Sequence, residues 1–185
     1  MITSIHSANF IRAFLLSLPL IVGGILHMVA VKADILSYLK KPIHQSLFGA
    51  NKTWRGFFIM PLATWPGVLL AQYIEVVVDL NTPLLTTTSS WLLAIYLGYG
   101  YCLAELPNSF LKRRLGIKEG LTSDRFKWTF IILDQADSAI GCMVAYKFLV
   151  DISWTDFWLT IILGTLIHLV FNILLFKAKI RKNPY

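Results

Sequence analysis

Five apolar runs, each long enough to cross a membrane, divide this chain and restrict what it can fold into. A helix needs about 20 predominantly apolar residues to span the hydrocarbon core of a bilayer. A soluble chain of 185 residues, even with 56% hydrophobic residues, rarely carries several such runs. We therefore predict an all-α fold, a polytopic membrane helix bundle of about five transmembrane helices in one domain over 1–185. The expected spans are Phe10–Val31, Phe57–Val78, Leu84–Ala104, Trp128–Val150 and Phe157–Phe176.

The basic residues are distributed unevenly among the segments that join these spans. If the five spans alternate in direction, all of the 17 Lys and Arg residues except Arg12 and Lys147 lie on one side. The positive-inside bias then predicts an N-terminus outside and a cytoplasmic C-terminus. The net charge of +7 has two explanations: a topology signal that also attracts anionic lipid heads, or an anionic substrate bound at the cytoplasmic face. We expect no nucleic-acid partner, because the cations occupy short loops between spans.

Two carboxylates, Asp134 and Asp137, lie inside the fourth apolar run. A charge at the centre of a membrane helix costs about 2.5 to 3.5 kcal/mol on insertion scales, so a lipid-facing position is disfavoured for both. Helical spacing places them on one face together with Ser138, where at about 6 Å and an effective dielectric of about 20 they would repel by about 3 kcal/mol. Mg²⁺ would neutralise the pair. The alternatives are a shared proton or salt bridges to a neighbouring helix.

The first long loop ends in a glycine-flanked basic segment from Gly49 to Gly56. Its glycines would let backbone amides approach an anion closely, and its side chains supply cations and hydrogen-bond donors. This combination suits a phosphate group. The alternative is a basic interfacial anchor with Trp54 at head-group depth. The candidate binding residues are Asn51, Lys52, Thr53 and Arg55.

A second basic loop is expected after the third span, which Pro107 should end or kink. Three consecutive cations, Lys112 to Arg114, follow Ser109 there and would neutralise a triphosphate or a lipid phosphate. A simple topology signal is the alternative explanation of Lys112, Arg113 and Arg114.

Polar residues elsewhere in the spans have other expected roles. Glu75, near the outer end of the second span, should be solvated at the interface. His168 and Asn172 lie four residues apart on one face of the last span. We expect both to form hydrogen bonds to a neighbouring helix, and contact with a substrate is the alternative role.

Three blocks together resemble the CDP-archaeol synthase family of membrane enzymes, which transfer CMP from CTP to an archaeal ether-lipid phosphate. The matching segments are Lys52-Thr53-Trp54-Arg55-Gly56, Leu106-Pro107-Asn108-Ser109-Phe110 followed by Lys112-Arg113-Arg114, and Asp134-Gln135 with Asp137-Ser138. The last span and the basic tail ending in Pro184 and Tyr185 also look like that family. One departure is Pro42-Ile43-His44, where an acidic residue is expected after the proline.

The second and third blocks are also similar to phosphatidate cytidylyltransferases. Glu119 stands where that family has Asp, and Gln135 where it has Arg, so these departures and the short chain favour the archaeol-type branch. The resemblance implies CTP and a lipid phosphate as substrates and Mg²⁺ as cofactor, held by Asp134 and Asp137. It further implies that Lys52 and Arg55 bind the triphosphate. Lys112, Arg113 and Arg114 would bind either phosphate, and Asn51, Ser109 and Ser138 would be hydrogen-bond partners.

Other activities are compatible with parts of the same pattern. The acceptor could be a diacylglycerol phosphate, as in the phosphatidate cytidylyltransferases. A membrane cation transporter could use the two aspartates as an ion site, although it leaves both basic loops unexplained. A non-catalytic membrane scaffold would bind no CTP.

Overall fold

The computed structural model describes residues 2–79, 83–119, 121 and 126–180, and the secondary structure in these residues is helical apart from an isolated bridge between Pro42 and Thr53. Five long helices cross the bundle, and two short helices, η1 (Ser37–Leu39) and α2 (Gln45–Phe48), lie in the first loop. The predicted all-α bundle is confirmed. The basic tail with Pro184 and Tyr185 lies outside the described residues. The long helices are α1 (Ile2–Lys32), α3 (Trp54–Val78), α4 (Ser90–Arg114), α5 (Lys127–Leu149) and α6 (Trp154–Lys177).

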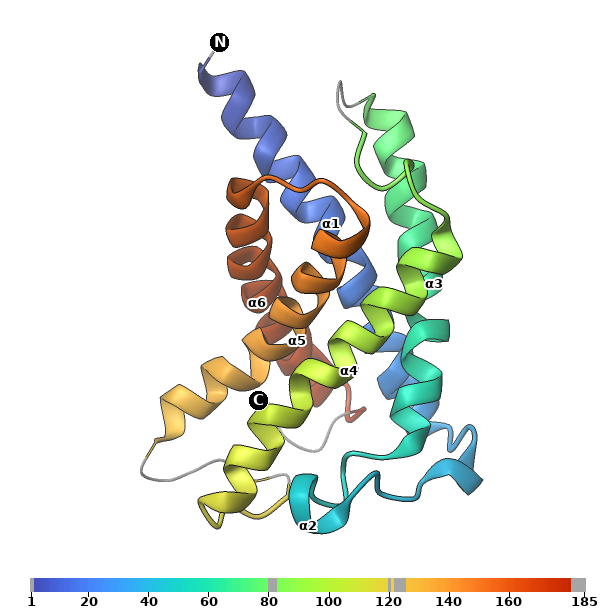
Figure 1. The fold of residues 1–185 in the computed structure, drawn as a ribbon, viewed down its shortest axis with the longest axis vertical. Helices are drawn as coiled ribbons and strands as arrows, with labels where there is room; N and C mark the ends of the chain where they lie inside the picture. The colour runs from blue at the N-terminus through green and yellow to red at the C-terminus, as the bar shows by residue number, and fades with distance from the viewer. Residues whose placement is uncertain (1, 80–82, 120, 122–125, 181–185) are drawn as a thin grey trace.

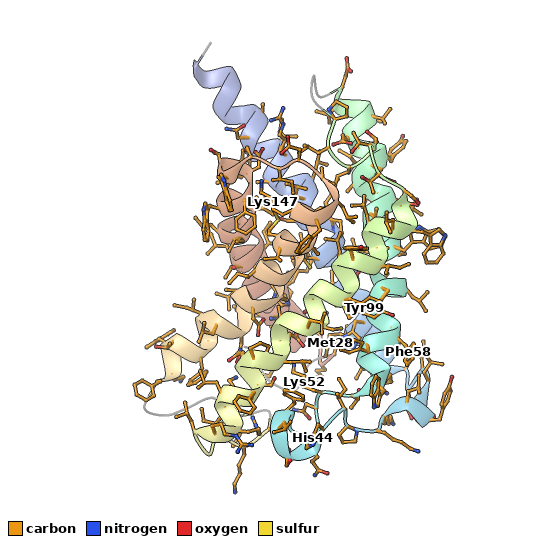
Figure 2. The ribbon with its side chains drawn as sticks, viewed as in Figure 1. Met28, His44, Lys52, Phe58, Tyr99 and Lys147 are labelled. Atoms are coloured by element: carbon orange, nitrogen blue, oxygen red, sulfur yellow. The ribbon has the colours of Figure 1, made fainter. Side chains whose placement is uncertain are left out.

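Three of these helices are both long and apolar enough to cross a membrane: Ala8–Lys32 within α1, Trp54–Val78 and Trp154–Lys177. Helices α4 and α5 are similar in length, at 25 and 23 residues, but polar and charged side chains interrupt them. Large apolar side chains remain exposed on the outside of the bundle, among them Phe58, which Figure 2 labels on α3. Such a surface suits contact with lipid.

The bundle brings both long loops to one end (Figure 1). Helix α1 packs along α3 and α6, and α4 packs between α3 and α5. The last turns of α1, α4 and α6 and the first turns of α3 and α5 therefore lie near the same end, together with α2. This arrangement collects the two predicted basic segments at one end of the molecule.

Small residues allow the closest helix contacts. A Cβ atom on Gly141 would overlap the Gly100 carbonyl oxygen and the Ala104 side chain, and a Cβ atom on Gly98 would overlap the backbone of Pro61. Because only glycine leaves this space, the backbones of α4 and α5 approach closely near their middle. Toward the basic end, polar side chains of α4 bond carboxylates of α5.

The third expected span differs from α4 at both ends. Helix α4 begins at Ser90 rather than Leu84, and it continues through Pro107 to Arg114. The proline therefore does not end the helix, although it lacks the N–H that would bond the carbonyl four residues earlier. Contacts of the last turns with α2 and with side chains of α5 hold the helix beyond it. Ser109, Lys112, Arg113 and Arg114 consequently lie on a helix and not in a loop.

The expectation that Glu75 is solvated is wrong. The residue is 3% exposed, and its carboxylate accepts hydrogen bonds from the backbone N–H groups of Leu84, Leu85 and Thr86 at 2.7 to 3.0 Å. Residues 84–88 thus fold back against α3 instead of starting α4. The buried carboxylate and these three backbone N–H groups satisfy one another's hydrogen-bonding needs.

We predict that Gly141→Ala loosens the contact between α4 and α5. The added methyl group must displace backbone, and such overpacking costs about 1 to 3 kcal/mol, so the thermal unfolding temperature in detergent should fall. The control is Gly164→Ala, because a Cβ there meets only Ser17 Oγ at 3.6 Å and Ala139 Cβ at 3.7 Å. Equal unfolding temperatures for the two variants would contradict the close packing.

Candidate active site

A cavity of about 980 Å³ opens at the basic end of the bundle. Its walls come from α1, α3, α4, α5 and α6 and from the loop between α1 and α3. Most of the residues singled out in the sequence line it, from segments far apart in the chain. They are Asn51, Lys52, Thr53, Arg55, Ser109, Lys112, Arg113, Asp134 and Asp137.

The two aspartates of α5 are joined by side chains from α4. The Asn108 amide nitrogen donates to Asp134 Oδ1 at 2.7 Å and to Asp137 Oδ2 at 2.9 Å. Lys112 Nζ donates to Asp134 Oδ1 at 2.6 Å and forms a salt bridge with the same carboxylate. A cation and an amide dipole from the neighbouring helix thus offset the repulsion between the carboxylates.

The donor set around Asn108 fits a magnesium ion. The two carboxylates converge on one point, and the buried side-chain oxygen of Asn108 has no hydrogen-bond partner among the described residues. No group of three or more His, Cys, Asp or Glu side chains in the described part of the chain is placed to hold a metal. Mg²⁺ commonly takes only one or two carboxylates and completes its octahedron with water and substrate phosphates. Two aspartates beside an open cavity meet that requirement.

Lys52 is held across the cavity from α5. The backbone around it pairs with the preceding strand-like segment, through Ile43 N–H to the Lys52 carbonyl at 2.8 Å and Trp54 N–H to the Lys41 carbonyl at 3.1 Å. Its ammonium group forms a salt bridge with Glu105 of α4. Burial alone would lower the pKa of Lys52, but the Glu105 carboxylate outweighs burial and raises that pKa above its ordinary value. Lys52 is therefore a cation throughout the neutral range. Figure 2 labels it in the lower half of the bundle.

Arg55 is also paired with a carboxylate. It is 8% exposed, and its guanidinium donates to Asp34 Oδ1 at 3.1 Å. Asp34 lies just after α1 and binds Lys40 as well, and the hydrogen bond from Lys40, despite the opposing effect of burial, lowers the pKa of this carboxyl below its usual value. One aspartate after the end of α1 thus binds a cation of the first loop and a cation in the first turn of α3.

Glu119 closes the cavity mouth from the segment after α4. Its Oε1 atom accepts a hydrogen bond from the Ala50 N–H at 2.9 Å. Gly49 has a φ of +88°, and a Cβ there would lie 2.7 Å from Glu119 Cγ, so only glycine fits this turn. In this structure the glycine-flanked turn thus donates to a carboxylate of the protein, and the phosphate expected there stays a prediction.

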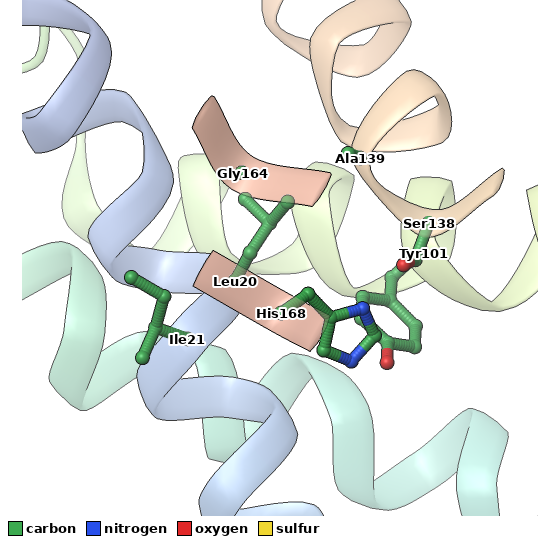
Figure 3. A pocket seen from close by; sticks show the side chains of 7 residues that line it. All are labelled: Leu20, Ile21, Tyr101, Ser138, Ala139, Gly164 and His168. Carbon is green, nitrogen blue, oxygen red and sulfur yellow. The ribbon is translucent and has the colours of Figure 1, made fainter. Parts of the chain in front are cut away.

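Two of the predicted site residues do not line the large cavity. Arg114 points to the surface, where it donates to the Ser46 carbonyl at 3.2 Å and stacks on the Phe110 ring. Ser138 is 1% exposed and lines a separate cavity of about 10 Å³ beside Tyr101 and His168 (Figure 3). Their positions favour packing and anchoring over substrate contact.

The polar residues of α6 contact α5, as expected. Asn172 donates to Gln135 Oε1 at 2.6 Å, and His168 Nδ1 lies 3.5 Å from the Gln135 carbonyl oxygen. Both side chains also line the large cavity.

Several residues of the site were absent from the sequence-based set: His27, Glu105 and Asn108, which line the cavity, and Asp34, which binds Arg55. Glu105, Asn108 and Lys112 are spaced three and four residues apart, which places them on one helix face. This spacing would have predicted one polar helix face if the sequence analysis had continued the helix through Pro107. For His27 and Asp34 the sequence offers no comparable pattern.

The fold and the cavity define a helical membrane enzyme whose substrates are anionic. The family model for CDP-archaeol synthase (CarS-like) matches residues 42–185. The chain belongs to the CDP-archaeol synthase family and is a CTP-dependent nucleotidyltransferase.

Curated relatives named CDP-archaeol synthase support the same assignment. The chain is 25% identical to the relative from Methanococcoides burtonii, with 75% of this chain and 82% of that protein covered. The relative from Saccharolobus solfataricus is 25% identical and that from Pyrobaculum islandicum 26%, each with 75% of this chain and 74% of the relative covered. No solved structure matches the chain.

The salt bridge between Lys52 and Glu105 predicts non-additive effects on stability. Lys52→Met and Glu105→Gln should each lower the unfolding temperature in detergent, because each leaves a polar group without its partner. The double variant should lose less than the sum, with a coupling free energy of about 0.5 to 3 kcal/mol. Additive losses would mean that the two groups do not interact.

Proposed function

We propose that this chain transfers CMP from CTP to an archaeol-type glycerol phosphate in the membrane, giving a CDP-activated lipid and pyrophosphate. The observation that carries the proposal is the single cavity in which Asp134 and Asp137, bridged by Asn108, face the cations Lys52 and Lys112. Family membership supports a lipid phosphate as the acceptor class. That the lipid of this acceptor is of the archaeol type is a further part of the proposal.

The reaction joins two anions. An oxygen of the lipid phosphate attacks the α-phosphorus of CTP, a new P–O bond forms, and the bond between the α- and β-phosphates breaks as pyrophosphate leaves. The attacking oxygen already carries negative charge, so no strong general base is required. Positioning and charge neutralisation are therefore the main contributions asked of the protein.

We assign Asp134 and Asp137 to the binding of Mg²⁺. When bound, the ion would supply positive charge against the phosphate oxygens and the leaving pyrophosphate. The side-chain oxygen of Asn108, which has no hydrogen-bond partner among the described residues, would be a further oxygen ligand for the ion. Lys112, which here binds Asp134, would bind a phosphate oxygen.

The remaining cations are assigned by their position in the cavity. Arg55 and Arg113 line it, and each has a buried Nε atom without a hydrogen-bond partner among the described residues. Those donors suit the triphosphate, because a guanidinium binds phosphate oxygens in pairs. Lys52 interacts electrostatically with both Glu105 and Asp137, so it lies where the two substrates would meet.

The membrane orientation follows the distribution of the basic residues. We assign the end that carries the cavity to the cytoplasm, since CTP arrives from there and the positive-inside bias favours it. The N-terminus would then lie outside.

Replacing either aspartate should abolish transfer. Asp134→Asn and Asp137→Asn keep side-chain shape and remove charge, so we expect CMP transfer to fall by at least about 100-fold, as for the loss of a preorganised electrostatic group. Purified variants would be incubated with labelled CTP, Mg²⁺ and a panel of lipid phosphates, including archaeol-type and diacylglycerol phosphates.

Asp151→Asn is the matched control, because Asp151 is exposed after the far end of α5 and should leave turnover unchanged. Near-normal turnover in either site variant would overturn the assignment of the pair. Preference for the diacyl acceptor would overturn the archaeol-type acceptor while leaving the reaction class intact.

A further inference from the structure

The inner part of the cavity contains basic side chains that the nucleotide and metal assignments leave unused. His27 of α1 and His168 of α6 line the same cavity as Lys52 and Glu105. We propose that His27 and His168, with Lys52 at their boundary, bind the phosphate group of the lipid acceptor. The inference rests on the proposed function and names the site at which its second substrate is held.

The hydrogen-bonding groups at this position suit a phosphate. The Glu105 carboxylate interacts electrostatically with Lys52, His27 and His168, so three basic groups gather around one acid. A phosphate monoester offers several acceptor oxygens and up to two negative charges, which complement imidazole and ammonium donors. Of the cations assigned to the nucleotide, Arg55 lies in the first turn of α3, and Lys112 and Arg113 lie in the last turn of α4.

The histidines and the aspartates lie at similar distances from the helix ends at the basic end of the bundle. His27 lies five residues before the end of α1, which is about 7.5 Å along the axis, and Asp134 lies seven residues after the start of α5, about 10 Å. His168 is nine residues from the end of α6, about 13.5 Å. A lipid phosphate can reach such a depth from within the membrane, whereas CTP must enter from the aqueous end.

Part of the apolar lining of the cavity lies on the same two helices. Met28 and Val31 of α1 and Phe171 and Leu175 of α6 line it. On α6 the spacing of His168, Phe171 and Leu175 places the imidazole and the apolar side chains on one face. A ligand bound there meets a polar group at one end and hydrocarbon along its length, which fits a lipid phosphate and not a nucleotide.

Figure 3 shows the inner end of this region, where the His168 ring stands beside Tyr101. The ring centroids are 6.3 Å apart in an edge-on arrangement. His27 lies against the first turn of α3, with its Nε2 atom 3.6 Å from the position a Cβ on Gly56 would take. Both imidazoles are therefore positioned by packing. Because the matched family region begins at residue 42, it assigns no role to His27.

The test compares His27→Gln and His168→Gln with the wild type in detergent micelles, at varied archaeol-type glycerol phosphate and varied CTP. We expect the KM for the lipid phosphate to rise about tenfold or more in each variant, the factor that corresponds to about 1.4 kcal/mol. The KM for CTP should stay within about twofold of wild type. His44→Gln is the matched control, because His44 bonds Ser46 Oγ outside the cavity and should change neither constant.

His27→Gln is the decisive variant, because His168 also contacts the Gln135 backbone and its loss could disturb packing. A rise in the KM for CTP equal to that for the lipid, or no change in either constant, would overturn the proposal.

A binding measurement separates this inference from the proposed reaction. Thermal unfolding would be followed with the lipid phosphate, with the same lipid lacking phosphate, and with glycerol phosphate lacking chains. We expect stabilisation by the lipid phosphate alone, and its loss in His27→Gln. Equal stabilisation by chain-free glycerol phosphate would show a general phosphate site and overturn the lipid assignment. Stabilisation that depends on His27 in a protein without CMP transfer would support the site while the proposed reaction failed.

Discussion

The contact between α4 and α5 is the constraint on which the candidate site depends. Gly100 and Gly141 let the two backbones approach until side chains larger than hydrogen would overlap. One turn or more toward the basic end, the same two helices present Asn108 and Lys112 to Asp134 and Asp137. Since the carboxylates repel each other, they can stay together inside the bundle only while α4 supplies donors to both.

Paired charges are the second general feature of the site. Lys52 pairs with Glu105, Arg55 with Asp34 and Lys112 with Asp134, while Glu119 accepts the Ala50 N–H. An isolated charge taken from water into the bundle would be far more costly than these pairs. In the proposed reaction, phosphate oxygens would replace carboxylates as partners of the cations, and a metal ion would replace Lys112 and Asn108 as the partner of the aspartates. Such an exchange would leave no charge in the cavity without a partner.

The sequence predicted the elements of this fold well where hydrophobic length decided the outcome. The five expected spans correspond to the five long helices, because an apolar run of that length has few alternatives to a helix in a membrane bundle. The prediction failed at Pro107 and Leu84, where tertiary contacts outweigh local signals. Side chains of α5 hold the last turns of α4 beyond the proline, and the buried Glu75 captures the backbone of residues 84–86 that would otherwise begin the helix.

The site was predictable where its residues form local blocks. Lys52 and Arg55, Lys112 and Arg113, and the two aspartates stand in short polar segments within or beside apolar runs, and all line the cavity. Ser138 and Arg114 belong to the same blocks but face away, because neighbours on a helix point in different directions. His27 and Asp34 could not be found in this way, since their relation to the site arises only when α1 packs beside α3 and α6.

The proposed reaction requires one cavity to hold two anions. The cavity is lined by the two aspartates, by cations of the first loop, α3 and α4, and by residues of α1 and α6. In that proposal a nucleotide would enter from water and a lipid phosphate from the membrane, and each would bring negative charge toward Asp134 and Asp137. Like charges brought that close repel strongly where water is scarce. Lys52, Arg55, Lys112 and Arg113 would then supply positive charge to both phosphates, because all four line the same cavity as the aspartates.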